Sequence, residues 1–192
     1  MAESASLVRS TLLPLEGAVS TGAAEWPRLA ACAGLIGKPT GLSGAPHCHL
    51  ARTPSAGNGQ PTRLMLVTEP EARKKLAALC GDQSFIAEAP VVVVACGKNL
   101  HLNSATEGPN LWVLVDGAIA LDHLTLAARA EGLGTCWIGV IGSKEVKQFV
   151  GLSEDMDVVS VTPLGYPASP DAFRAPGPHV PMEEFARWER WA

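Results

Sequence analysis

The sequence of 192 residues lacks the patterns that mark several common protein classes. Its five cysteines include no CxxC pair, and an odd number of widely spaced cysteines favours free thiols in a reducing cytoplasm over a disulfide framework. No run of Lys or Arg occurs and the net charge is -4, so nucleic acid is not an expected partner. The chain opens with no basic stretch followed by an apolar one, so we expect no secretion signal and a cytoplasmic location.

Motifs for common catalytic and binding chemistries are also missing. There is no GxSxG, GxGxxG, Walker, HExxH or EF-hand pattern. The triplet His47-Cys48-His49 carries metal-ligating side chains, but adjacent residues rarely converge on one ion and no second cluster follows. We therefore expect a loop with incidental ligating residues there and predict no metal site.

The most informative stretch runs from Trp112 to Gly139. Residues 112–130 are apolar or small at nearly every position, which predicts a long helix covered on almost all sides, in a core or an interface. A membrane span is the alternative, but Asp116, Asp122 and Arg129 would be costly in hydrocarbon, so we expect no membrane. Gly132 and Gly134 suit the end of this helix, and residues 135–140 have the composition of a strand.

The rest of the chain alternates strands with helices. Pro90–Cys96 is an unbroken β-branched run, which is typical of a strand buried on both faces. The other predicted strands are residues 63–68 and 158–164, and the predicted helices are 70–79, 143–150 (with Ser143 as its N-cap) and 182–191. Residues 81–85 are predicted to form a turn and 86–89 a connection. Before residue 50, only 26–36 has weak helical character. These elements predict a sheet layered with helices.

A glycine-rich loop lies between Pro54 and Pro61. It contains Ser55, Asn58 and Gln60, whose side chains form hydrogen bonds, and its small residues allow a ligand to approach the backbone. Composition alone leaves two interpretations open, a polar turn and a ligand-binding loop.

Residues 51–191 resemble the nitroreductase family of FMN-dependent NAD(P)H oxidoreductases. The resemblance rests on four blocks in the family's order: PSAGNGQP at 54–61, APVVVVAC at 89–96, DGAIALDHLTLAARAEGLGTCWIG at 116–139 and PLGYP at 163–167. It implies an α+β layered sandwich, with a mostly antiparallel central sheet flanked by helices. It also implies an intertwined homodimer in which the C-terminal segment wraps the partner. The implied division is an atypical N-terminal segment, 1–50, and an FMN-binding domain, 51–192.

The resemblance also implies the cofactor site. Pro54, Ser55 and Asn58, with Gln60 beside them, would approach the flavin from the partner subunit. Gln83 matches a position whose amide side chain bonds the pyrimidine edge of the flavin ring. Ile138 and Gly139 match a loop whose backbone amides face flavin N5 and O4. The cofactor would carry the hydride chemistry, so no catalytic side chain is expected.

The implied activity is a ping-pong reduction of a nitroaromatic, a quinone or a similar small acceptor, with NADH or NADPH as donor. The family normally holds the FMN phosphate with an RRSxR cluster. The corresponding window, residues 20–26, has no basic pair, and Arg174 or His179 is the candidate replacement. The alternative is a non-catalytic or flavin-sequestering homodimer of the same fold.

Overall fold

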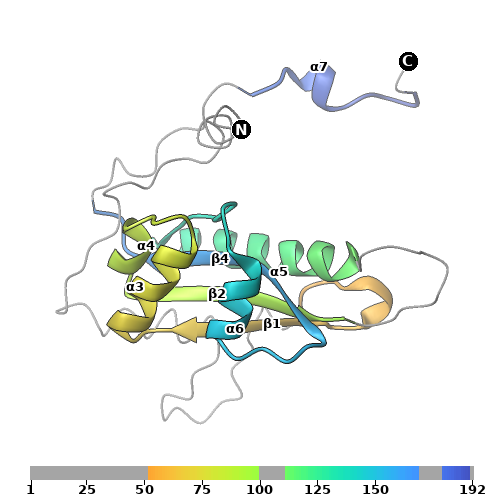
Figure 1. Cartoon of the computed structure of the whole chain (residues 1–192). Helices are drawn as coiled ribbons and strands as arrows, with labels where there is room; N and C mark the ends of the chain where they lie inside the picture. Colours follow the sequence, from red (N-terminus) through yellow and green to blue (C-terminus); the bar gives the residue numbers. More distant parts are fainter. Residues whose placement is uncertain (1–51, 100–110, 169–178, 191–192) are drawn as a thin grey trace, which may run out of the picture.

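The computed structural model describes residues 52–99, 111–168 and 179–190. Its centre is a four-stranded sheet in the order β1-β2-β4-β3 (Figure 1). The strands are β1 (Thr62–Val67), β2 (Val91–Lys98), β3 (Gly134–Thr135) and β4 (Met156–Gly165), and every neighbouring pair is antiparallel. The predicted α+β class and antiparallel sheet are confirmed. The predicted helix at 26–36, the N-terminal segment 1–50 and the His47-Cys48-His49 triplet lie outside the described residues.

Helices cover both faces of the sheet (Figure 1). Val93 and Ala95 of β2 pack toward α5 (Leu111–Ala130), whereas Val92 and Val94 pack toward the opposite layer. That layer consists of α3 (Pro70–Leu79), α4 (Phe85–Glu88) and α6 (Ser143–Phe149). Successive strand side chains point to opposite faces, so a strand covered on both faces must be apolar throughout. The VVVVAC run meets that requirement.

The long helix α5 has two different sides. Leu121, Leu124 and Ala128 are fully buried against the sheet, while Val115 and Leu126 on the other side are 44% and 62% exposed. Gly117 allows the close approach to the sheet, because a Cβ there would lie 2.7 Å from Cγ2 of Val159. Among the described helices, α5 alone is long and apolar enough to cross a membrane. A helix that forms the core of a globular domain has the same composition, and the sheet-facing side of α5 is such a core.

Two predictions about short segments were wrong. The strand predicted over 135–140 shrinks to the two residues of β3 and a single bridge between Ile138 and Val161. In between, the indole of Trp137 turns toward α5, where its Nε1 donates to Thr125 Oγ1 at 3.4 Å. The connection predicted over 86–89 is part of α4, which is held against α3 because the Arg73 guanidinium donates to the carbonyls of Ala87 and Ala89.

Two predictions about helix ends were also wrong. The C-terminal helix predicted over 182–191 is only α7 (Met182–Phe185). Every residue from 179 to 190 is exposed and α7 stands clear of the sheet (Figure 1). A helix without a packing partner gains little beyond its own marginal stability. Ser143 was predicted as the N-cap of α6, but Gly142 takes that position and no side chain caps the helix.

Candidate functional site

The glycine-rich loop is held in a defined conformation by its own side chains. Ser55 Oγ accepts the N–H of Gln60 at 3.0 Å, and Gln60 Nε2 donates to Asn58 Oδ1, also at 3.0 Å. Gly57, Asn58 and Gln60 have positive φ values of 55°, 56° and 48°. Outside glycine such values are uncommon, so these hydrogen bonds hold a strained backbone in place. The loop leaves Pro54, Asn58 and Gln60 exposed.

Asp116 of α5 anchors this loop to the central helix. The N–H of Ala56 points at both carboxylate oxygens, with distances of 3.0 and 3.2 Å, and Asp116 is only 2% exposed. Sequence reasoning noted Asp116 only as a polar exception in an apolar helix. A lone carboxylate near the start of such a helix was the signal that could have identified it, because a buried charge requires a hydrogen-bonding partner.

A second group consists of Gln83, in the turn between α3 and α4, and of Ile138 and Gly139, between β3 and α6. The N–H of Gly142 donates to the carbonyl of Leu79 at 2.9 Å, and a Cβ on Gly81 would lie 3.1 Å from Val140 Cγ1. These contacts bring the turn that carries Gln83 beside the segment that carries Ile138 and Gly139.

This second group leaves one donor and one acceptor open. The N–H of Ile138 donates to the carbonyl of Val161 at 3.1 Å, so it is already used within the sheet. Among the residues that the structure describes, the N–H of Gly139 has no partner. Gln83 Nε2 donates to the carbonyl of Cys80 at 2.5 Å, which leaves Gln83 Oε1 as an acceptor.

The glycine-rich loop and the second group lie at opposite edges of the sheet. The loop leads into β1, which is one edge strand, whereas Ile138 bridges to Val161 of β4 on the side of β3, the other edge. Neighbouring strands lie about 4.8 Å apart, so three strand spacings separate the two edges by roughly 14 Å. Figure 1 shows the loop, in orange, beside one end of α5, and α4 on the opposite face of the sheet, away from the loop. The structure therefore brings Gln83, Ile138 and Gly139 together but does not bring Pro54, Ser55, Asn58 and Gln60 to them within one chain.

The two predicted phosphate-binding candidates belong to the C-terminal part of the chain. His179 is exposed at the start of the described segment 179–190. Arg174 lies outside the described residues.

The described cysteine thiols are buried or partly buried. Burial raises the pKa of Cys80 to about 11 and also raises the pKa values of Cys96 and Cys136. These thiols are therefore protonated at neutral pH, and a protonated thiol is a poor nucleophile and metal ligand. Within the described ranges, no three His, Cys, Asp or Glu side chains are grouped closely enough to hold a metal ion.

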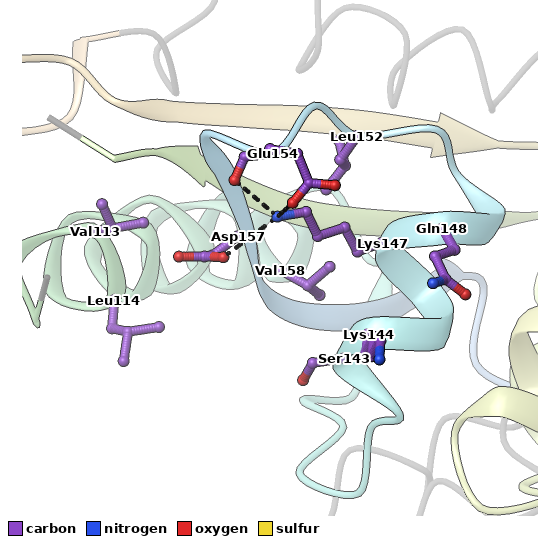
Figure 2. A pocket seen from close by; sticks show the side chains of 10 residues that line it. All are labelled: Val113, Leu114, Ser143, Lys144, Lys147, Gln148, Leu152, Glu154, Asp157 and Val158. Carbon is purple, nitrogen blue, oxygen red and sulfur yellow. Dashed lines mark hydrogen bonds and ion pairs between the residues drawn. The ribbon is translucent and has the colours of Figure 1, made fainter. Parts of the chain in front are cut away.

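A cavity of about 460 Å³ lies between α5, α6 and the first residues of β4 (Figure 2). Val113, Leu114 and Val158 give it an apolar wall. Lys147 Nζ donates to the carbonyl of Glu154 at 3.0 Å and lies 3.8 Å from Asp157 Oδ1, so the charge of Lys147 is balanced within the cavity wall. The cavity is lined by none of the predicted site residues.

An antiparallel sheet between two helical layers, with open polar groups near its two edges, defines an α+β sandwich protein. Comparison with known sequences identifies the family. The model of the Nitroreductase family matches residues 28–166, and the chain belongs to that family.

Individual relatives agree with the family. The chain is 32% identical over 119 residues to an Archaeoglobus fulgidus protein with the provisional name NADH dehydrogenase/NAD(P)H nitroreductase, covering 59% of this chain and 66% of that protein. It is 31% identical over 145 residues to the Bacillus subtilis FMN reductase (NAD(P)H), covering 68% of this chain and 57% of the relative. The solved structure of B. megaterium NfrA2 superposes with a TM-score of 0.63 at 30% identity, over 74% of this chain and 63% of that one. The chain thus spans about three fifths of the length of these relatives.

Proposed function

We propose that the protein is an FMN-dependent oxidoreductase that uses NADH or NADPH to reduce a small acceptor such as a nitroaromatic or a quinone. The names of similar proteins support this, namely the FMN reductase (NAD(P)H) of Bacillus subtilis and the NADPH-flavin oxidoreductase of Vibrio harveyi. The observation on this chain that carries the proposal is that the open N–H of Gly139 lies in a segment packed beside the turn that carries Gln83, whose Oε1 is also open.

These open groups match the hydrogen-bonding edges of a flavin ring. The pyrimidine edge of the ring presents an N–H donor between carbonyl acceptors, so Gln83 Oε1 suits the donor. Gly139 N–H suits the acceptors N5 and O4, and Ile138 supports it by fixing the strand bridge to Val161. Bound FMN supplies hydride transfer between the nicotinamide and the acceptor, while the protein orients the ring. No protein side chain is needed as a nucleophile or a base.

The proposed active form is a homodimer. In a single chain, α5 exposes Leu111, Trp112, Val115 and Leu126 along one side, and such an apolar stripe is typical of an interface. Pairing two copies through α5 would supply the second group of one chain with the glycine-rich loop of the other. Each flavin site would then contain Pro54, Ser55, Asn58 and Gln60 from the partner chain.

The C-terminal segment is proposed to wrap the partner. Val180, Met182, Phe185 and Trp188 are between 59% and 93% exposed in the single chain. Contact with the partner would cover these apolar side chains and would bring His179 and Arg174 toward the interface, where they are the candidates to hold the FMN phosphate. A cytoplasmic location remains part of the proposal.

The second candidate function is a non-catalytic homodimer of the same fold, which either lacks flavin or sequesters it. It is favoured by one observation, the absence of a basic pair in residues 20–26, since FMN phosphate is usually held by charge-assisted bonds to arginine. Such a protein would lack bound flavin, or would sequester it without turning over NAD(P)H.

The absorbance spectrum of the purified protein, before and after addition of FMN and removal of the excess, tests both functions. Bound-flavin bands that bleach on addition of NADH or NADPH, and return on addition of a quinone, would support the oxidoreductase. Bands that persist with both nucleotides would support the non-catalytic dimer. A colourless protein that cannot be reconstituted would contradict the oxidoreductase and would support the flavin-free form of the second candidate.

A further inference from the structure

Asp116 is an unusual residue in the core of this protein. It is 2% exposed, and none of the described Lys, Arg or His side chains forms an ion pair with it. Its partner is the backbone N–H of Ala56, sixty residues earlier in the chain. Burying a carboxylate removes it from water, and one backbone donor compensates that loss only in part. An apolar side chain would pack α5 at lower cost, so packing alone does not explain a carboxylate here.

The position of Asp116 links the loop to the proposed interface. Asp116 lies one helical turn after Trp112 and one residue after Val115, both of which are exposed on the proposed dimer side of α5. Ala56 directly follows Ser55 and begins the short turn that contains Asn58. A single bifurcated hydrogen bond therefore connects the loop proposed to face the flavin to the helix proposed to pair the two chains.

We propose that Asp116 is a positioning residue for the flavin site of the partner chain, because it fixes the Ser55–Gln60 loop on α5. This inference rests on the proposed FMN function and adds a residue that does not itself touch the flavin. The positive-φ residues of the loop need such an anchor, since a strained backbone relaxes when the contacts that hold it are removed. A relaxed loop would present Ser55 and Asn58 to the flavin in a range of positions.

Three variants separate positioning from general stability. Asp116→Ala removes the acceptor and is expected to weaken FMN binding by about ten- to a hundredfold, the usual effect of losing a charge-assisted bond. Asp116→Asn keeps one oxygen acceptor and should restore most of the affinity. Leu124→Ala opens a cavity beneath the same helix, so it should lower the melting temperature with little effect on FMN affinity. Flavin fluorescence titration and thermal unfolding of each dimer measure both quantities.

Mixed dimers test whether Asp116 acts on the partner's site. Two differently tagged chains are co-expressed and the mixed dimer is isolated by both tags. In the first mixed dimer, one chain carries Asp116→Ala and the other carries Gly139→Val. If each loop serves the other chain, both lesions fall in the same site and the dimer binds one FMN.

In the second mixed dimer, one chain carries both substitutions and its partner is wild type. The lesions then fall in different sites, and no FMN binds at concentrations near the wild-type dissociation constant.

The opposite pair of results, no FMN in the first mixed dimer and one in the second, would overturn the proposal. So would wild-type affinity in Asp116→Ala, or an equal loss of affinity in Leu124→Ala. If the wild-type protein takes up no FMN, the proposed function fails on its own. Hydrogen exchange of the Ala56 and Gln60 amides in the flavin-free protein then decides about Asp116. Faster exchange in Asp116→Ala than in Asp116→Asn supports the anchor, and equal exchange contradicts it.

Discussion

Gly139 offers a backbone donor that the described residues leave without a partner, while its neighbour Ile138 uses its own N–H in the bridge to Val161. A glycine at this exposed position keeps the approach to the donor clear. The proposed flavin site thus depends on a position where a side chain is absent.

Replacing Gly139 by Val should therefore abolish FMN binding while the dimer stays folded. The branched side chain would occupy the space in front of the N–H, where the flavin ring is proposed to lie. Flavin content after reconstitution and sedimentation of the variant give the two measurements. Gly134→Ala is the control, because its added Cβ would meet only the carbonyl of Gly165 at 3.7 Å. Normal flavin content in Gly139→Val would contradict the assignment.

The thiol of Cys80 gives a prediction about stability at alkaline pH. Burial raises its pKa from 9.0 to about 11. Below about pH 9 both folded and unfolded chains keep the proton, so stability is unaffected. As the pH rises from about 9 to 11, the unfolded chain ionises first, and folding stability falls by at most about 3 kcal/mol.

The alkaline decline due to Cys80 should be absent in Cys80→Ala. Urea unfolding at about pH 8 and about pH 11 gives the decline for each protein as a difference, which removes the constant cost of the lost side-chain volume. Equal declines in the two proteins would show that the Cys80 thiol ionises in the folded chain as it does in the unfolded one.

At the scale of single residues, the sequence indicated which residues carry hydrogen-bonding groups, but not which of those groups already have a partner within the chain. The segments that carry Gln83 and Gly139 lie side by side, and only the structure shows that the Ile138 amide is already used in the bridge to Val161. Asp116 was overlooked because its partner, the Ala56 N–H, is sixty residues away and has no sequence signature. Hydrogen bonds between distant segments are set by tertiary packing, which composition does not encode.

At the scale of elements, long apolar patterns in the sequence predicted the helix or strand correctly, whereas short segments with weak patterns were predicted wrongly. The helix α5 and the strand β2 lie where they were predicted, because long apolar runs have few ways to be buried. β3, α4 and α7 are four residues or shorter, and their form depends on neighbours such as Trp137 and Arg73. The C-terminal helix was predicted too long because its residues have helical composition but no packing partner among the described residues of the chain.

The exposed apolar side of α5 leads to a prediction about the dimer interface. Leu126 is 62% exposed in the single chain, so Leu126→Glu should leave the fold intact. In the proposed dimer, the same substitution would bury a charge in an apolar contact, and the dimer should dissociate and lose its FMN. Light scattering and flavin content are the measurements. Gln148→Glu adds an equal charge on exposed α6 and should change neither. A flavin-loaded dimer of Leu126→Glu would place the interface elsewhere.

At the scale of the whole molecule, the two groups of site residues are separated within one chain. The glycine-rich loop lies beside β1 at one edge of the sheet, and Gly139, with the turn that carries Gln83, lies beside the other edge. In the proposed dimer, a second copy related through α5 would supply the missing half of each site.

Sedimentation velocity of the FMN-loaded protein, recorded at both protein and flavin wavelengths across a dilution series, tests this account most directly. We predict that flavin absorbance moves only with the dimer, at one FMN per chain, and that dilution to monomer releases it. Flavin that travels with the monomer at undiminished affinity would show that one chain forms a complete site, and would contradict the account.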